Sequence, residues 1–166
     1  MGKLKELYQK NKEIILYLIF GVITTIISLA ACYATLKVGV IFMHDEKGDP
    51  TELLDIIGST TQWITGVTVA FITNKIWVFT DAEKGFRATT KQFFVFSASR
   101  VVTYFLEVII NLATIAILEK LGYSPFSIIG ILITVRVWAK VISSIFVTVS
   151  NYFISKLLVF KKSRAK

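Results

Sequence analysis

The sequence predicts an all-α integral membrane protein with four transmembrane helices. Its 166 residues are 54% hydrophobic and only 18% charged, with a mean hydropathy of +0.66. A soluble domain usually needs about 25% charged residues to cover its surface. The charges also cluster, so that several uncharged stretches are long enough to cross a hydrocarbon core of about 30 Å. The whole chain, residues 1–166, is therefore expected to form a single membrane domain.

The first expected span covers residues 14–36, which carry no charge. The others are expected at about residues 56–79, 93–118 and 141–160. The apolar region 121–160 is about twice as long as one helical crossing requires. Ser124 and Pro125 are therefore expected to open an interfacial or re-entrant helix before the last span.

The start of the chain also resembles a secretory signal. Lysines precede the first apolar run, and residues 29–32 read Leu-Ala-Ala-Cys, like a lipoprotein cleavage site. Signal peptides, however, have apolar cores of about 7–15 residues, and this run continues past Cys32. We therefore expect a retained first helix. Because Cys32 is the single cysteine, an internal disulfide is excluded.

The distribution of lysine and arginine predicts that both termini are cytoplasmic. Four lysines precede the first span, three basic residues lie in the loop 80–91, and four follow Phe160. The loop after Leu36 is acidic, and the turn at residues 119–122 has one lysine. The acidic loop contains a helix-start signal, in which Asp49 caps, Pro50 opens and Glu52 completes a capping box. It predicts a short helix on the outer surface; a solvated loop is the alternative.

Each expected span carries one stripe of small or polar residues at helical spacing. Small residues let helices approach closely in lipid, so the stripes are expected to turn inward in a bundle. Packing alone explains the first two. The four stripes comprise Gly21, Thr25, Ser28, Cys32 and Thr35; Gln62, Gly66, Ala70 and Thr73; Arg100, Tyr104, Glu107, Asn111 and Thr114; and Ser144, Thr148, Asn151 and Ser155.

Arg100 and Glu107 lie inside the third expected span. An ionised arginine at the bilayer centre costs at least about 2.5–3.5 kcal/mol, so it needs a partner or a function. The two share a helix face but stand about 10 Å apart along the axis, which disfavours a direct pair and favours an anion site at Arg100. The alternative is a network in which Glu107 or backbone carbonyls satisfy Arg100. Lys140 is either a second cationic site or a lysine that snorkels to the outer interface.

A weak internal repeat suggests two hairpins in the same orientation. Residues 70–79 (AFITNKIWVF) align with residues 151–160 (NYFISKLLVF), and residues 17–21 (YLIFG) align with residues 93–97 (FFVFS). The predicted architecture is therefore four transmembrane helices arranged as two parallel-repeat hairpins, with short interfacial helices on the outer side.

At these same residues the sequence resembles the GtrA-like family of small four-span bacterial membrane proteins, and its branch tied to teichoic-acid glycosylation. The usual aromatic residue before the final Val-Phe is Leu158 here, and the loop 43–58 is long and acidic, so outer-face details transfer poorly. The resemblance rests on residues 20–25 (FGVITT), on Asn74, Lys75, Trp77 and Phe79, on Arg100, and on Asn151, Lys156, Val159 and Phe160.

The resemblance implies a protein of the bacterial plasma membrane that flips a polyprenyl-phosphate-linked sugar from the cytoplasmic to the outer leaflet. The sugar would serve glycosylation of a cell-surface polysaccharide or teichoic acid. Membrane lipid and membrane glycosyltransferases are the implied partners, and a homo-oligomer is left open. Such a substrate needs a basic group for its phosphate and polar side chains for its sugar. The candidate binding residues are Arg100, Lys140, Asn74, Asn151, Glu107 and Asn111.

Other functions are less favoured. A non-transporting subunit that anchors a glycosyltransferase would not need Arg100 in the membrane. A cation exchanger would depend on Glu107, beside which basic residues repel cations. The sequence has no nucleophile–base arrangement or metal cluster, so we expect neither an enzyme nor a cofactor. Its basic residues flank apolar runs, which argues against nucleic-acid binding.

Overall fold

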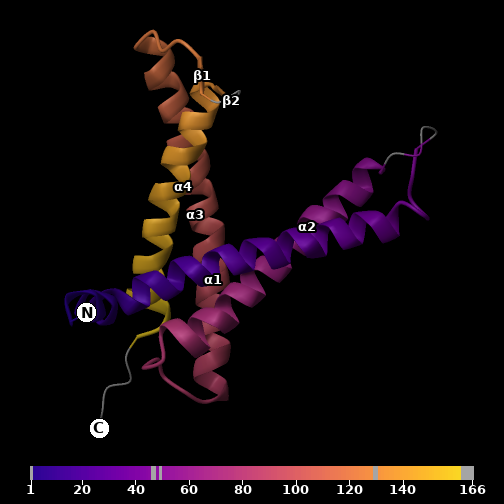
Figure 1. Ribbon diagram of the computed structural model, residues 1–166. Coiled ribbons are helices and arrows are strands. Elements are labelled where there is room, and N and C mark those ends of the chain that lie inside the picture. Colours follow the sequence, from indigo (N-terminus) through magenta and orange to yellow (C-terminus); the bar gives the residue numbers. More distant parts are fainter. Residues whose placement is uncertain (1, 46–47, 49, 129–130, 162–166) are drawn as a thin grey trace. The chain divides into compact units, whose positions relative to one another are not determined.

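The computed structural model describes residues 2–45, 48, 50–128 and 131–161 (Figure 1). The chain divides into two compact units, Met1–Ala82 and Glu83–Lys166, which are described separately. The first contains helices α1 (Gly2–Gly39) and α2 (Glu52–Thr73) and the π-helical segment η1 (Asn74–Val78). The second contains α3 (Phe86–Lys120), strands β1 (Phe126–Ile128) and β2 (Ile131–Ile133), α4 (Val135–Ile154) and the π-helical segment η2 (Ser155–Val159).

In the first unit α1 and α2 form an antiparallel hairpin (Figure 1). The two helices pack through small residues. A Cβ atom at Gly58 would lie 2.9 Å from Cδ2 of Leu36 and 3.5 Å from Sγ of Cys32. One at Gly66 would lie 3.5 Å from Cβ of Ser28. Glycine at position 58 therefore lets the two backbones approach closely, whereas position 66 leaves ordinary van der Waals room for a Cβ atom. Ser28, Cys32 and Gly66, which belong to the predicted small-residue stripes, lie at this contact as expected.

The helix α2 begins at a different cap residue from the one that the sequence predicted. Thr51 is the N-cap, and its side-chain oxygen accepts a hydrogen bond from the backbone N–H of Leu54 at 3.3 Å. The helix that begins there continues directly into the second apolar segment, so the predicted separate interfacial helix is wrong. Asp49, the predicted cap, lies outside the described residues.

In the second unit α3 and α4 form an antiparallel hairpin joined by β1 and β2 (Figure 1). The strands pair antiparallel, with Phe126 opposite Ile133 and Ile128 opposite Ile131. An interfacial helix was predicted here, and that prediction is wrong. The segment is rich in isoleucine and phenylalanine, whose branched and aromatic side chains favour strands, and it is too short for a stable isolated helix.

Each unit ends in a π-helical turn at the same place in the repeated strings. The backbone N–H of Phe79 donates to the carbonyl oxygen of Asn74 at 2.7 Å, and that of Phe160 donates to the carbonyl oxygen of Ser155 at 2.8 Å. Both bonds reach back five residues, one more than in an α-helix. The units therefore share the order helix, helix, π-turn, whereas the parallel-repeat arrangement stays a prediction.

The protein is a membrane protein by the length and composition of its helices. Within the described residues three segments are long and apolar enough to cross a bilayer: Gln9–Gly39, Phe86–Lys120 and Val135–Val159. The polar residues along α2 keep it out of this group, so the four-span arrangement stays a prediction. The last helix begins at Val135, before the expected position 141, and therefore includes Lys140 within its second turn.

Candidate functional site

The side of α3 that faces α4 carries a stripe of four polar or charged residues and one phenylalanine. Its members recur every three or four residues, the spacing that places side chains on one side of a helix. Measured along the helix axis, the stripe is about 22 Å long. It comprises Gln92, Phe96, Arg100, Thr103 and Glu107.

At the centre of this stripe the Arg100 guanidinium lies over an aromatic ring. Its Cζ atom is 4.4 Å from the centroid of the Phe96 ring, a distance that permits a cation–π interaction. Phe96 is fully buried, and its ring centroid is 6.0 Å from that of Phe160. The half-buried guanidinium is thus supported by a fixed ring, with a planar set of donors suited to two phosphate oxygens.

Beside Arg100, a hydrogen bond joins the two helices of the second unit. The Thr103 hydroxyl donates to Oδ1 of Asn151 at 2.9 Å, and Thr103 is only 2% exposed. This contact engages the amide oxygen of Asn151, a predicted sugar-binding group, in helix packing. The predicted stripe ran through Tyr104, which is 60% exposed; its neighbour Thr103 takes the buried place.

At the far end of the stripe, Glu107 forms an ion pair with Lys140. Nζ of Lys140 lies 2.5 Å from Oε1 of Glu107, and the two side chains are 68% and 23% exposed, respectively. The structure therefore pairs Glu107 with Lys140 across the hairpin. A phosphate bound at Lys140 would have to compete with this carboxylate. Asn111 lies half-buried one turn further along α3.

Asn74, the remaining predicted site residue, belongs to the first unit. It is 4% exposed and opens the π-helical segment η1, where its carbonyl oxygen accepts the bond from Phe79. The structure thus brings Arg100, Glu107, Lys140 and Asn151 onto one helix pair, with Asn111 nearby on α3.

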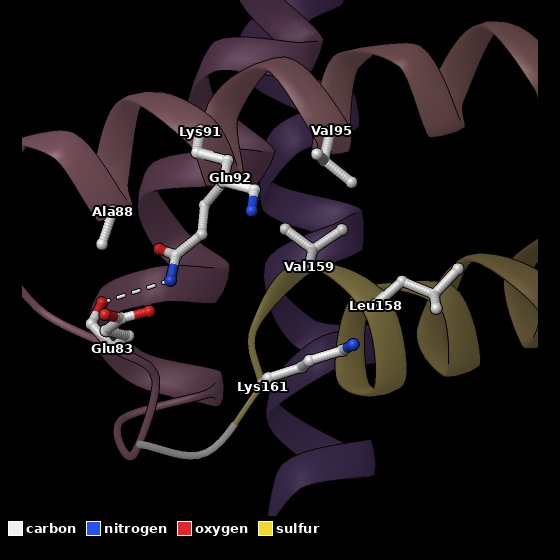
Figure 2. Close-up of a pocket in the computed structure, with 8 residues that line it drawn as sticks. All are labelled: Glu83, Ala88, Lys91, Gln92, Val95, Leu158, Val159 and Lys161. Carbon is white, nitrogen blue, oxygen red and sulfur yellow. Dashed lines mark hydrogen bonds between the residues drawn. The ribbon is translucent and has the colours of Figure 1, made fainter. Parts of the chain in front are cut away.

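A pocket that the sequence did not predict opens at the other end of the second unit (Figure 2). Its cavity volume is about 240 Å³. Gln92 is 7% exposed there, and its amide nitrogen donates to the backbone oxygen of Glu83 at 3.2 Å. Gln92 was missed because it precedes the expected span 93–118; the available signal in the sequence was an amide next to a lysine at a span boundary. The pocket is lined by Glu83, Ala88, Lys91, Gln92, Val95, Leu158, Val159 and Lys161.

Comparison with known proteins finds one matching family and several relatives. The sequence profile described as "GtrA/DPMS, transmembrane domain" matches residues 16–160. The uncharacterized membrane protein YwcD of Bacillus subtilis is 30% identical over 149 residues, which are 90% of this chain and 97% of that protein. The cell wall teichoic acid glycosylation protein GtcA of Listeria monocytogenes is 25% identical over 149 residues, 90% of this chain and 85% of GtcA. GtcA of Listeria innocua is 24% identical with the same coverage. No solved structure matches at a significant level.

Proposed function

The chain belongs to the GtrA/DPMS transmembrane domain family, and on that premise we propose that it serves the glycosylation of a cell-surface polymer, as GtcA does by its name. The specific activity that we propose is the movement of a polyprenyl-phosphate-linked sugar from the cytoplasmic to the outer leaflet. In this role the protein is not an enzyme. A membrane glycosyltransferase on the outer side consumes the sugar lipid and so gives the movement its direction.

The observation that carries this proposal is the position of Arg100 on the inward stripe of α3. A charged group within a spanning helix is costly and marks a path for a charged substrate. The phosphodiester of the sugar lipid is an anion that must pass the hydrocarbon core. Arg100, held over Phe96, offers it a fixed basic group partway along the helix. The amide nitrogen of Asn151 brings two hydrogen-bond donors suited to sugar oxygens, and Asn74 and Asn111 are further candidates for the sugar.

The proposal includes an orientation in which four spans form two parallel hairpins with both termini in the cytoplasm. The start of α3 then lies on the cytoplasmic side, where the sugar lipid is made, and Lys140 lies nearer the outer face. A Cys32→Ser background with single cysteines at Lys84 and Ser124, both exposed, tests this orientation. In intact cells an impermeant thiol reagent should label Ser124→Cys and leave Lys84→Cys unlabelled until the cells are opened. The reverse pattern would overturn the orientation.

Substitution of Arg100 tests the phosphate site. Arg100→Ala should lower surface glycosylation about 10- to 100-fold, the loss expected for charge-assisted hydrogen bonds to a phosphate. Arg100→Lys should retain part of the activity, because lysine keeps the charge but not the planar donor set. Arg136→Ala is the matched control, because Arg136 is exposed in the first turn of α4. All variants are compared at equal protein levels in the membrane. Full glycosylation with Arg100→Ala would show that the assignment is wrong.

A reconstituted assay separates transport from the anchoring of a glycosyltransferase. The purified chain is placed in vesicles that contain a labelled short-chain polyprenyl-phosphate hexose, and the fraction of label accessible from outside is followed with time. A transporter should accelerate the exchange between leaflets, and Arg100→Ala should remove the acceleration. If the wild type gives no acceleration while glycosylation in cells still requires it, the anchoring subunit becomes the better account.

A further inference from the structure

The pocket at the start of α3 has a basic rim and a polar, partly apolar interior. Lys91 and Lys161 are both exposed and lie on different segments, one on α3 and one after η2 (Figure 2). Glu83 is the single carboxylate among the lining residues, so the lining carries a net positive charge. Two ammonium groups on separate segments can hold one anion between them, each as a point charge.

The interior of the pocket suits a sugar beside that anion. The buried Gln92 side chain is held in place by its bond to the Glu83 backbone. The carboxylate of Glu83 accepts hydrogen bonds from hydroxyl groups. Ligand pockets for drug-sized molecules measure about 300–1,000 Å³, so a cavity of about 240 Å³ suits one small head group. A charged phosphate with a single sugar fits this chemistry and size better than an oligosaccharide.

The remaining lining residues give the pocket an apolar side. Val95 and Leu158 are both exposed, whereas Val159 is buried. In a membrane protein, exposed apolar side chains of this kind contact lipid tails. A head group in the pocket can therefore keep its hydrocarbon chain in the bilayer.

From these features we propose that this pocket binds the phosphate-and-sugar head of the lipid-linked substrate on the cytoplasmic side, before it reaches Arg100. This inference rests on the proposed transport function and adds an entry site to it. Gln92, Phe96 and Arg100 follow one another on the same stripe of α3, so Arg100 is two helical turns, about 12 Å, beyond Gln92. The head passes from two lysines at the membrane boundary to Arg100 further along α3.

The test compares two double variants of the full chain in nanodiscs. Lys91→Ala with Lys161→Ala removes both rim charges, and Lys84→Ala with Lys120→Ala removes the same charge from exposed positions outside the pocket. Binding of a short-chain polyprenyl-phosphate hexose is measured by native mass spectrometry, with phosphatidylglycerol and inorganic phosphate as separate probes. We expect the pocket variant to bind the sugar lipid at least about tenfold more weakly, and the control to stay within about twofold.

The outcomes separate this inference from the transport proposal. If the wild type flips the sugar lipid and the pocket variant binds it normally, the pocket assignment is wrong and transport stands. If the pocket variant loses phosphatidylglycerol or inorganic phosphate as strongly as the sugar lipid, the pocket is a general anion site and the inference fails. If the wild type neither binds nor moves the sugar lipid, the transport proposal and the inference fall together.

Discussion

The two units of the chain are both helical hairpins that end in a π-turn, but they hold their helices together differently. In the first, α1 and α2 approach through Gly58 and Gly66, which face Leu36 and Ser28. In the second, α3 and α4 are joined by the hydrogen bond from Thr103 and the ion pair of Glu107. Small residues give close packing in lipid, whereas polar groups there also cost desolvation free energy. The first hairpin is therefore held by packing, whereas the second carries charged groups that packing alone does not require.

The alignment of the two repeated sequence strings shows which positions differ between the two units. Phe20 aligns with Phe96, and each of these rings contacts an aromatic residue near the end of its own hairpin, Trp77 and Phe160 respectively. Continued along the helices, the same alignment places a neutral residue of the first unit at the position of each of four polar or charged residues of the second unit. The pairs are Thr24 with Arg100, Ala31 with Glu107, Ser59 with Lys140, and Ala70 with Asn151.

The largest expected effect on stability comes from Lys140→Ala. It leaves Glu107, whose side chain is 23% exposed, without its cationic partner. An unpaired ionised group in a spanning helix costs about 2–3 kcal/mol, so we expect less protein in the membrane and a lower Tm in detergent. Adding Glu107→Gln should restore most of the loss, because it removes the unpaired charge. A double variant that is no better than Lys140→Ala would contradict this account.

Two glycine-to-alanine substitutions in the first unit should change the free energy of unfolding in opposite directions. A Cβ at Gly39 would overlap Cδ1 of the buried Leu54, so Gly39→Ala should cost about 1–3 kcal/mol as an overpacked contact. At Gly66 the nearest side-chain atom is 3.5 Å away, and Gly66→Ala should stabilise by up to about 1 kcal/mol through helix propensity. The Tm of each variant is measured by thermal unfolding in the same detergent. Equal shifts in Tm would show that contacts at these glycines do not determine the stability of this hairpin.

A contrast of similar size is expected between two hydroxyl groups of the second unit. Thr103→Val removes the donor to Asn151 and leaves a buried acceptor, which should cost about 1–3 kcal/mol. Ser155 is almost fully buried, and its hydroxyl has no hydrogen-bond partner within the part of the chain that the structure describes. Ser155→Ala should therefore be neutral or stabilise by up to about 1 kcal/mol. Destabilisation by Ser155→Ala would point to a bound water or ligand group at this hydroxyl.

Hydropathy predicted much of the fold because a continuous apolar run has few alternatives to a helix in lipid. It placed α1 and α3 around residues 14–36 and 93–118, although both helices extend beyond the apolar runs. The segment after Pro125 was misread because its apolar residues have no helical period, and their strand propensity decides its structure. The capping signal was also attributed to Asp49, although Thr51 caps the helix.

The candidate site was less predictable than the fold. Arg100 could be identified from the sequence because a charged side chain within a membrane span is energetically costly. The predicted stripe, however, included Tyr104 in place of its buried neighbour Thr103. The partner of Glu107 lies on another helix, and the sequence alone does not encode which lysine meets it. Gln92 was missed because hydropathy marks the membrane boundary and not the pockets formed there.

The two π-turns make the length of the segments that contain them important. A π-turn holds one residue more than the α-helical turn it replaces, so it acts as a one-residue insertion accommodated inside the helix. Deleting one residue between Ser155 and Phe160 would remove that insertion and let η2 close as an α-helical turn. Phe160 should then stay beside the Phe96 ring and Lys161 at the pocket. A further inserted residue has no such turn to absorb it and would rotate these two residues by about 100°. Natural variants of this protein should therefore accept a one-residue deletion in these turns more readily than an insertion.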